Sequence, residues 1–230
     1  MIEISLWRLS LLLIPLGVVA WLMIQWSGGA KELWVATARM VVQLLAVGYL
    51  LIFLFEGNQS WATALVVLFM MVVSAVIAIR TIRQQRKSAF GDALFAIGVG
   101  GGLVFLLVVF GVLEGGRGFS ARFVIPIAGM IFANAMTAVT LSAERFEAEV
   151  KNGKDVLQAR KAAWNASLIP QINSFLAVGL VSLPGMMTGQ ILAGASPLDA
   201  VRYQILVMAM VLGSAGISVA IFLVRKMARS

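Results

Sequence analysis

The side chains that could do chemistry in this sequence are polar groups placed inside long apolar stretches. Asn134 lies in one such stretch, and Arg39 and Gln43 share one helical face of another because they are four residues apart. Polar and ionised groups are expensive to bury in hydrocarbon, so each is a candidate for lining a transport pathway. Two structural alternatives stay open. Arg39 could extend to the surface, only ~9 Å away at 1.5 Å per residue, and Asn134 could hydrogen-bond a neighbouring helix.

The segment Leu168–Gly194 has the most unusual composition. Pro184 has no amide hydrogen to donate, and Gly185 tolerates backbone conformations that other residues resist, so the pair predicts a kinked or broken helix. Non-helical backbone at membrane depth is tolerated only where protein or a water-filled cavity satisfies it. Transporters use such breaks for substrate contact and gating. Alternatively, Gly185 and Gly189 form a G-x-x-x-G pair that lets helices pack closely, and both roles can hold.

Several absences narrow the class of function. The chain has no His and no Cys, which removes most zinc sites, disulfides and His- or Cys-based catalysis. No G-x-x-x-x-G-K-[ST] motif occurs, so the chain does not hydrolyse ATP through a P-loop of its own. No paired carboxylates lie within an apolar stretch, which disfavours acid–base catalysis in a membrane. Gly98–Gly102 lies inside such a stretch and predicts close helix packing instead of a phosphate cradle. We expect no enzyme activity and no bound cofactor.

The candidate residues must be positioned by helices that cross a membrane. Of 230 residues, 61% are hydrophobic and 12% are charged, against ~45–50% and ~25% in soluble domains. A crossing helix needs ~20 mostly apolar residues. We therefore predict an all-α integral membrane protein that forms one domain over residues 1–230, with its sixth helix broken at the Pro-Gly pair. The seven predicted spans are Leu9–Trp26, Leu33–Phe55, Trp61–Ile79, Ala93–Leu113, Phe123–Ser142, Leu168–Gly194 and Ile205–Val224.

The basic residues predict which way the chain crosses. Of the 18 Lys and Arg residues, thirteen fall in one set of connecting segments and four in the other, with Arg39 inside a span. The richer side faces the cytoplasm, so the N-terminus is expected outside and the C-terminus inside. The net charge of +8 follows from these cytoplasmic segments, and we expect no nucleic-acid partner.

The longest connection, Ala143–Ser167, is cytoplasmic in this topology. Apolar residues recur at helical spacing on both sides of Asn152-Gly153, which is a turn dipeptide. Asp155 could cap the second piece. We expect two short helices lying near the membrane surface, which form either a solvated hairpin or a docking site for a partner.

Two runs of the sequence are long and specific: Gly179–Ile191 reads GLVSLPGMMTGQI, and Ile125–Ile131 reads IPIAGMI. Both resemble one known family, the FetB-type iron-export ABC transporter permeases. The likeness extends over essentially the whole chain and is strongest between Phe123 and Gln204. Outside the two runs, the residues that carry it are Arg39, Gln43, Gly48, Asn134, Met136, Gly194, Pro197, Ala200, Tyr203 and Gln204.

The resemblance implies a multi-pass permease of the bacterial inner membrane, related to plant aluminium-sensitivity permeases. It implies pairing with a separate cytoplasmic P-loop ATPase of the FetA type, which would bind ATP and Mg²⁺. It also implies assembly from two permeases and two ATPases, and export of iron. Coupling to the ATPase is then expected at Asp155, Leu157, Arg160 and Trp164.

The ligand atoms available in the predicted spans do not identify the transported species. Iron prefers carboxylate, imidazole or thiolate ligands, whereas the predicted spans offer amide oxygens, hydroxyls, backbone carbonyls and thioethers. Such a set binds a bare ferrous ion weakly, so a chelated or different cargo is an alternative. An ATPase-independent secondary transporter or channel for a metal or small metabolite, and a non-transporting scaffold, are the rival functions. The residues expected to line or gate a pathway are Arg39, Gln43, Met130, Asn134, Asn173, Ser182, Pro184, Gly185, Met186, Met187, Thr188 and Gln190.

Overall fold

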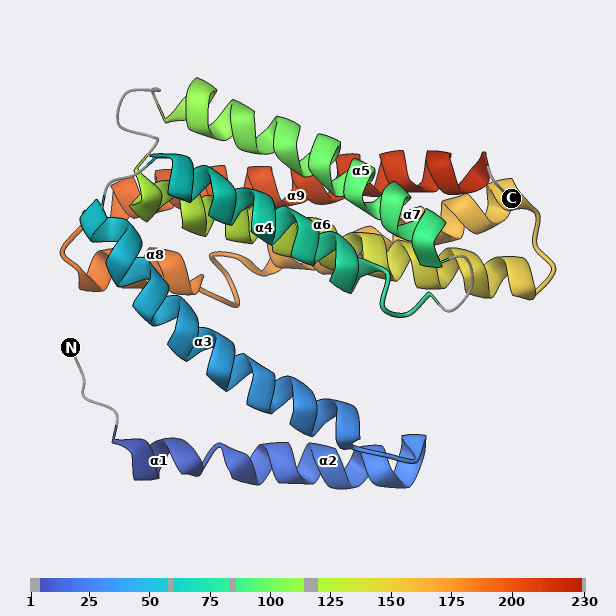
Figure 1. Cartoon of the computed structure of the whole chain (residues 1–230), viewed down its shortest axis with the longest axis horizontal. Coiled ribbons are helices and arrows are strands. Elements are labelled where there is room, and N and C mark those ends of the chain that lie inside the picture. The colour runs from blue at the N-terminus through green and yellow to red at the C-terminus, as the bar shows by residue number, and fades with distance from the viewer. Residues whose placement is uncertain (1–4, 58–59, 83–85, 114–119, 229–230) are drawn as a thin grey trace. The chain divides into compact units, whose positions relative to one another are not determined.

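The computed structural model describes residues 5–57, 60–82, 86–113 and 120–228. Within these ranges the chain is helical, with one isolated bridge between Val178 and Ser182 (Figure 1). The chain separates into two compact units, residues 1–57 and 58–230, and each is described by itself.

The first unit contains α1 (Leu6–Ser10), α2 (Leu13–Ser27) and α3 (Lys31–Gly57). The ranges Trp7–Ser27 and Lys31–Ile52 are long and apolar enough to cross a membrane. This unit therefore supplies the first two predicted spans.

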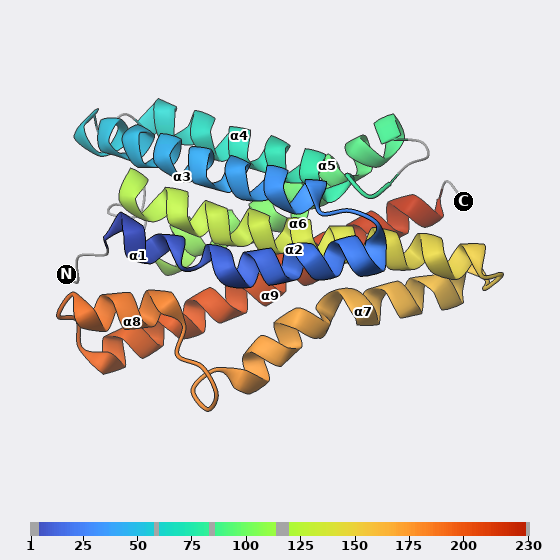
Figure 2. The same ribbon diagram turned by 90° about the horizontal axis from the view of Figure 1, so that it is seen from below.

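The second unit is built around α6 and α9. Among its described residues, α6 packs against α4, α5 and α7, and α9 packs against α5, α6, α7 and α8. Figure 2 shows α7 and α8 following each other along one side of α9. The elements are α4 (Ser60–Ala78), α5 (Arg86–Leu106), which continues into a π-helical turn at Leu107–Val112, α6 (Ala121–Lys151), α7 (Val156–Ala177), α8 (Gly185–Leu192) and α9 (Pro197–Met227).

Glycines in α5 let this core close. A Cβ atom built on Gly100 would lie 2.6 Å from the backbone nitrogen of Ser218 on α9, and one built on Gly101 would lie 3.1 Å from the ring of Phe132 on α6. A side chain at Gly100 would collide with backbone, so only glycine permits this spacing. The prediction that the glycine cluster serves close helix packing is confirmed at these two positions.

Ion pairs tie the C-terminal end of α9 to its neighbours. Arg225 Nε donates to Asp92 Oδ1 on α5 at 2.7 Å, and the Asp92 side chain is only 2% exposed. Lys226 Nζ donates to Glu147 Oε1 on α6 at 3.1 Å. Because a buried carboxylate is costly without a cation, these pairs hold this end of α9 in register with α5 and α6.

The prediction of an all-α membrane protein is confirmed. Six helical ranges of the described chain are long and apolar enough to span a membrane, and they overlap six of the seven predicted spans. The orientation and the single domain over residues 1–230 stay predictions. Of the basic residues on which the orientation rests, Arg83, Arg117 and Arg229 lie outside the described residues.

The sixth predicted span is broken, and the break ends at the Pro-Gly pair instead of being centred on it. α7 ends at Ala177, residues 178–184 are not helical, and Gly185 is the first residue of α8. Pro184 therefore starts a helix instead of interrupting one, because a helix start needs no amide hydrogen from its proline. Gly179 ends α7 with a left-handed conformation, φ 81°, which glycine adopts without steric strain.

The prediction of two short surface helices within Ala143–Ser167 is wrong. α6 continues unbroken to Lys151 and α7 begins at Val156, so this connection is a tight turn between two long helices. The turn falls at Asn152-Gly153, as predicted, with Gly153 at φ 82°. The helices continue because side chains on both pack together, and Phe146, Ala159 and Ala163 are almost completely buried.

Candidate functional site

Three adjoining cavities lie among α6, α7, α8 and α9, and Met208 borders all three. The Gln171 cavity, of ≈ 230 Å³, is also bordered by Asn134. The loop cavity, of ≈ 420 Å³, is bordered by Asn173 and Ser182, and the Gln204 cavity, of ≈ 360 Å³, by Gln204 itself. Since Ser174, Phe175 and Val178 are each shared by two cavities, the three form one connected region beside Met208.

One face of α7 and one face of α9 make the walls of these cavities. On α7, Gln171, Ser174 and Phe175 follow the i, i+3, i+4 spacing of a single helical face, and Val178 comes directly after the helix end. On α9, Gln204, Met208 and Val211 lie at i, i+4 and i+7. Both faces mix a few polar side chains with apolar ones, and the space between them is not completely filled.

The segment between α7 and α8 folds back on itself at the edge of the loop cavity. The Gly179 amide donates to the Ser182 carbonyl at 3.0 Å, and the Ser182 amide donates to the Ala177 carbonyl at 3.2 Å. Its apolar side chains point outward, with Leu180 at 88% and Val181 at 84% exposure. The amides of residues 179–182 are therefore all bonded within a small closed loop.

Two glutamines beside the cavities are buried without a partner for their oxygens. Gln171 is 5% exposed and Gln204 is 6% exposed. The Oε1 atom of each has no hydrogen bond. An unsatisfied buried polar atom costs ~1–3 kcal/mol, so both side chains are held at the expense of stability.

A separate groove of ≈ 570 Å³ lies between the start of α7 and the end of α9. Leu157, Arg160 and Trp164 line it from α7, and Leu223 and Val224 line it from α9. The structure therefore brings three of the four predicted coupling residues to one surface.

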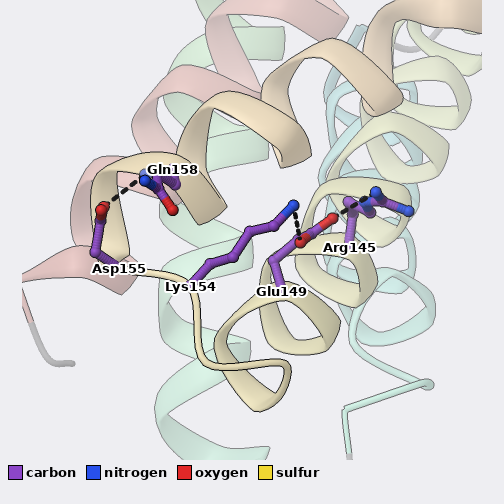
Figure 3. A network of polar contacts seen from close by, with 5 residues as sticks. All are labelled: Arg145, Glu149, Lys154, Asp155 and Gln158. Carbon is purple, nitrogen blue, oxygen red and sulfur yellow. Dashed lines mark hydrogen bonds and ion pairs between the residues drawn. The ribbon is translucent and has the colours of Figure 1, made fainter.

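The fourth coupling residue, Asp155, has a local role in the turn between α6 and α7 (Figure 3). Its side chain accepts from the Gln158 amide at 2.8 Å and so caps α7, as the sequence predicted. Beside it, Lys154 Nζ lies 2.6 Å from Glu149 Oε2, and Arg145 pairs with Glu149 Oε1. Glu149 lies beyond the predicted span 123–142. The hydrogen bond from Lys154 and the positive charges of Arg145 and Lys154 lower the pKa of its carboxyl group.

The comparison with known families decides what kind of protein has this arrangement. The family model described as uncharacterised protein family UPF0014 matches residues 4–162 and 154–229. The chain belongs to the UPF0014 family. No solved structure matches this UPF0014 chain.

The curated relatives confirm the resemblance that the sequence motifs indicated. This UPF0014 chain is 36% identical over 203 residues to the probable iron export permease protein FetB of Escherichia coli K12, a match that covers 82% of this chain and 77% of FetB. It is 34% identical over 221 residues to the UPF0014 membrane protein slr1647 of Synechocystis, covering 90% and 84%. It is also 34% identical over 202 residues to the protein ALUMINUM SENSITIVE 3 of Arabidopsis thaliana, covering 81% and 72%.

The structure of this UPF0014 chain gathers only part of the predicted pathway. Asn134, Asn173, Ser182, Pro184 and Met187 border the three cavities. The other predicted residues lie elsewhere. The apolar core is packed by Met130 and Met186. Helix α8 carries Gly185, Thr188 and Gln190, which do not border these cavities. Helix α3 of the first unit carries Arg39 and Gln43.

Sequence reasoning missed Gln171, Ser174, Gln204 and Met208 as lining residues. Gln171 stood inside a predicted span, and intramembrane polarity was a signal that could have found it. Gln204 stood one residue before a predicted span and was noted only for its family likeness. Met208 carries no signal, because a methionine on an apolar helix is ordinary core.

The donor set beside the cavities of this UPF0014 protein is neutral. Within the described ranges, no group of three or more His, Cys, Asp or Glu side chains converges as a metal site would require. Asn134 does not bridge to a neighbouring helix through its amide nitrogen. Its Nδ2 donates to the Met130 carbonyl of its own helix at 2.8 Å, which leaves its second N–H and its oxygen for other partners.

Proposed function

We propose that this protein is the membrane-spanning permease of an ABC transporter that exports a metal ion, iron above all, from the cytoplasm. The observation that carries the proposal is the interrupted helix pair α7–α8 beside three mostly apolar cavities, two of which also present amide and hydroxyl side chains, in a bundle of membrane-spanning helices. Transporters place their substrate sites at helix interruptions of this kind. The similarity to FetB, a probable iron export permease, supports iron as the transported ion.

The proposed energy source is a separate P-loop ATPase that binds ATP and Mg²⁺. We place its contact at the groove formed by Leu157, Arg160 and Trp164, since a partly apolar groove rimmed by basic groups suits a protein partner. The permease itself would catalyse no reaction. The proposed assembly contains two permeases and two ATPases in the bacterial inner membrane.

In this mechanism α7 transmits the movement. ATP binding closes the ATPase subunits, which push on the turn that Glu149 and Asp155 hold rigid. α7 then shifts against α9, whose C-terminal end, beside the same groove, is tied down through Arg225 and Lys226. The loop 178–184 absorbs the change, and the cavities open to each side in turn.

The first test is a pull-down of the full chain from its native membranes in mild detergent, with mass spectrometry of the bound proteins. We expect a stoichiometric P-loop ATPase that is released by Leu157→Glu or Trp164→Ala. The control Leu198→Ala, an exposed position at the opposite end of α9, should keep the ATPase bound. A chain that is captured alone contradicts the proposal.

The energy source distinguishes the proposed ABC transporter from the alternative, a secondary transporter or channel. In liposomes that contain the chain and its ATPase, iron export should follow ATP hydrolysis and be unaffected by collapse of ion gradients. Transport that follows an ion gradient in the absence of ATP would establish the alternative.

A further inference from the structure

We propose that the end of α7, the loop 178–184 and α8 bind the same surface of a second copy of this chain, so that the two loops meet around the transport pathway. This surface, the interruption face, comprises residues 172–192. The inference rests on the proposed function, which assembles two permeases. It adds the surface through which the two copies join.

The loop between α7 and α8 lies at the depth of the hydrocarbon. Between Arg202 and Arg225, α9 carries no charged residue, and this stretch rises about 33 Å, close to the ≈ 30 Å thickness of the hydrocarbon. Met208 lies about 9 Å of helical rise inside it from Arg202. Because Met208 borders the loop cavity together with Ser182 and Pro184, the loop lies at the same depth.

The loop presents backbone acceptors that its own chain does not satisfy. The amides of residues 179–182 donate to the carbonyls of Ala177 and Ser182, but among the described residues no hydrogen bond reaches the carbonyls of residues 178–181. The exposed side chains of Leu180 and Val181 point away from the bundle. Lipid tails donate no hydrogen bonds, and irregular backbone is tolerated at this depth only beside protein or enclosed water. The loop therefore needs a neighbour other than lipid.

Polar side chains continue this surface on both helices. Asn173 on α7, Ser182 in the loop and Thr188 on α8 are all exposed, and polar groups are costly to place against hydrocarbon. Thr188 borders none of the three cavities of the single chain. A second copy on the interruption face would bring it to the pathway, as the sequence predicted.

The charge pattern suits a second copy as the partner. A two-fold interface places the same surface patch on both sides, so any charge near its centre would face its own like. No charged residue occurs between Lys161 and Asp199. Just beyond the face, Asp199 and Arg202 form an exposed ion pair of opposite charges, which two copies can exchange. Most residues of the face are exposed, and its roughly 20 residues match the lower end of the ≈ 20–30 that each partner of a stable complex contributes.

The Gly185-x-x-x-Gly189 motif of α8 is also unused within the described part of the chain. A Cβ atom built on either glycine would meet nothing within 4 Å. Motifs of this kind let two helices approach closely, as in helix dimers. The two α8 helices of a pair can therefore pack along this motif without displacing any part of their own chains.

Single cysteines on the interruption face test the proposal, because the chain contains no Cys and a cross-link between single cysteines requires two copies. Val181→Cys, Thr188→Cys and Leu192→Cys are treated with a short bis-maleimide in native membranes, and the dimer, twice 24.6 kDa, is measured on a denaturing gel. Residues near a two-fold axis meet their own copies, so at least one position should cross-link several-fold more than the control.

The control is Phe69→Cys, an equally apolar and exposed position on α4, on the other side of the second unit (Figure 2). Cross-linking at all three positions that does not exceed this control overturns the proposal, whether lipid or the first unit then covers the face.

A matched glycine pair tests the close approach of α8. In the cysteine variant that cross-links best, Gly189→Val should reduce the dimer several-fold, since the new side chain has room in the single chain but separates the two α8 helices. Gly102→Val on α5, where a Cβ also meets nothing within 4 Å, should keep the dimer. An unchanged dimer yield in Gly189→Val overturns the proposal.

Capture of the ATPase distinguishes this inference from the proposed function. If the chain binds a P-loop ATPase but no position on the interruption face cross-links above the control, the proposed function stands and this interface falls. If the face cross-links in a Gly189-dependent way but no ATPase is captured, the interface stands and the ABC assignment falls.

Discussion

Whether a polar atom donates or accepts a hydrogen bond explains why some polar side chains of the helices are satisfied by their own helix and others are not. Ser74 and Thr140 donate to the carbonyls of Met70 and Met136, four residues earlier in the same helix, which is the usual way that short hydroxyl side chains are satisfied in membranes. A glutamine oxygen can only accept, and the amides inside its own helix already donate to carbonyls, so it finds no donor there. Gln171 and Gln204 therefore depend on a ligand or another element for a donor.

Single glycines likewise decide how closely α5 and α9 approach. We predict that Gly100→Ala destabilises the protein by about 1–3 kcal/mol, because its Cβ would meet the Ser218 backbone at 2.6 Å. Gly102→Ala, on the same helix with nothing within 4 Å, is the control and should be neutral or slightly stabilising. Thermal unfolding in detergent measures both. Equal unfolding temperatures for the two variants would show that the close contact does not limit stability.

At the scale of elements, the decisive feature is the interruption between α7 and α8. Gly179 ends one helix and Pro184 precedes the next, so the two residues bracket a loop closed by its own hydrogen bonds. The loop makes no anchoring contact of the kind seen at Arg225, and its side chains at Leu180 and Val181 are almost fully exposed. It is the part of the bundle best suited to change conformation.

The left-handed glycine in this loop leads to the second prediction. Gly179→Ala should cost about 1–2 kcal/mol, because φ is 81° and a Cβ is strained there although nothing lies within 4 Å. Hydrogen exchange at the Gly179 and Ser182 amides should then speed up about 5- to 30-fold. Gly185→Ala, which also meets nothing within 4 Å and lies in α8, is the control. Unchanged exchange at residue 179 would mean that the loop is not held in this conformation.

At the scale of the whole molecule, the question is how many times the chain crosses the membrane. Six continuous ranges qualify as spans within the described residues, and α7 with α8 would make a seventh, interrupted crossing. The number of crossings decides whether the α6–α7 turn and the α8–α9 connection lie on opposite sides of the membrane.

Single-cysteine labelling tests this topology directly, because the chain contains no Cys. We predict that Asn152→Cys and Ala228→Cys react with a membrane-impermeant maleimide only from the cytoplasmic side, since the basic segments face it. Ser196→Cys should react only from the outside. Labelling of residues 152 and 196 from the same side would show that α7 and α8 do not cross together.

Local patterns in the sequence were enough for several features of the fold. Long apolar stretches predicted the helices and their membrane location, because hydrocarbon allows a helix no unpaired backbone groups. Asn152-Gly153 predicted the turn, and the run around Pro184 predicted an interruption and the family. The position of the interruption was missed, since proline can break a helix or begin one, and the sequence does not say which.

The amino-acid sequence by itself therefore determined an all-helical membrane protein of the FetB-like family, because hydropathy, turn residues and motifs act over short stretches of chain. Tertiary structure alone decided that Gln171 and Gln204 border adjoining cavities that share Met208, and that Trp164 lies across from Leu223. These residues come from helices distant in the sequence. Their proximity depends on how α7 packs against α9, and that packing reflects the fit of whole helix faces, which no local pattern contains.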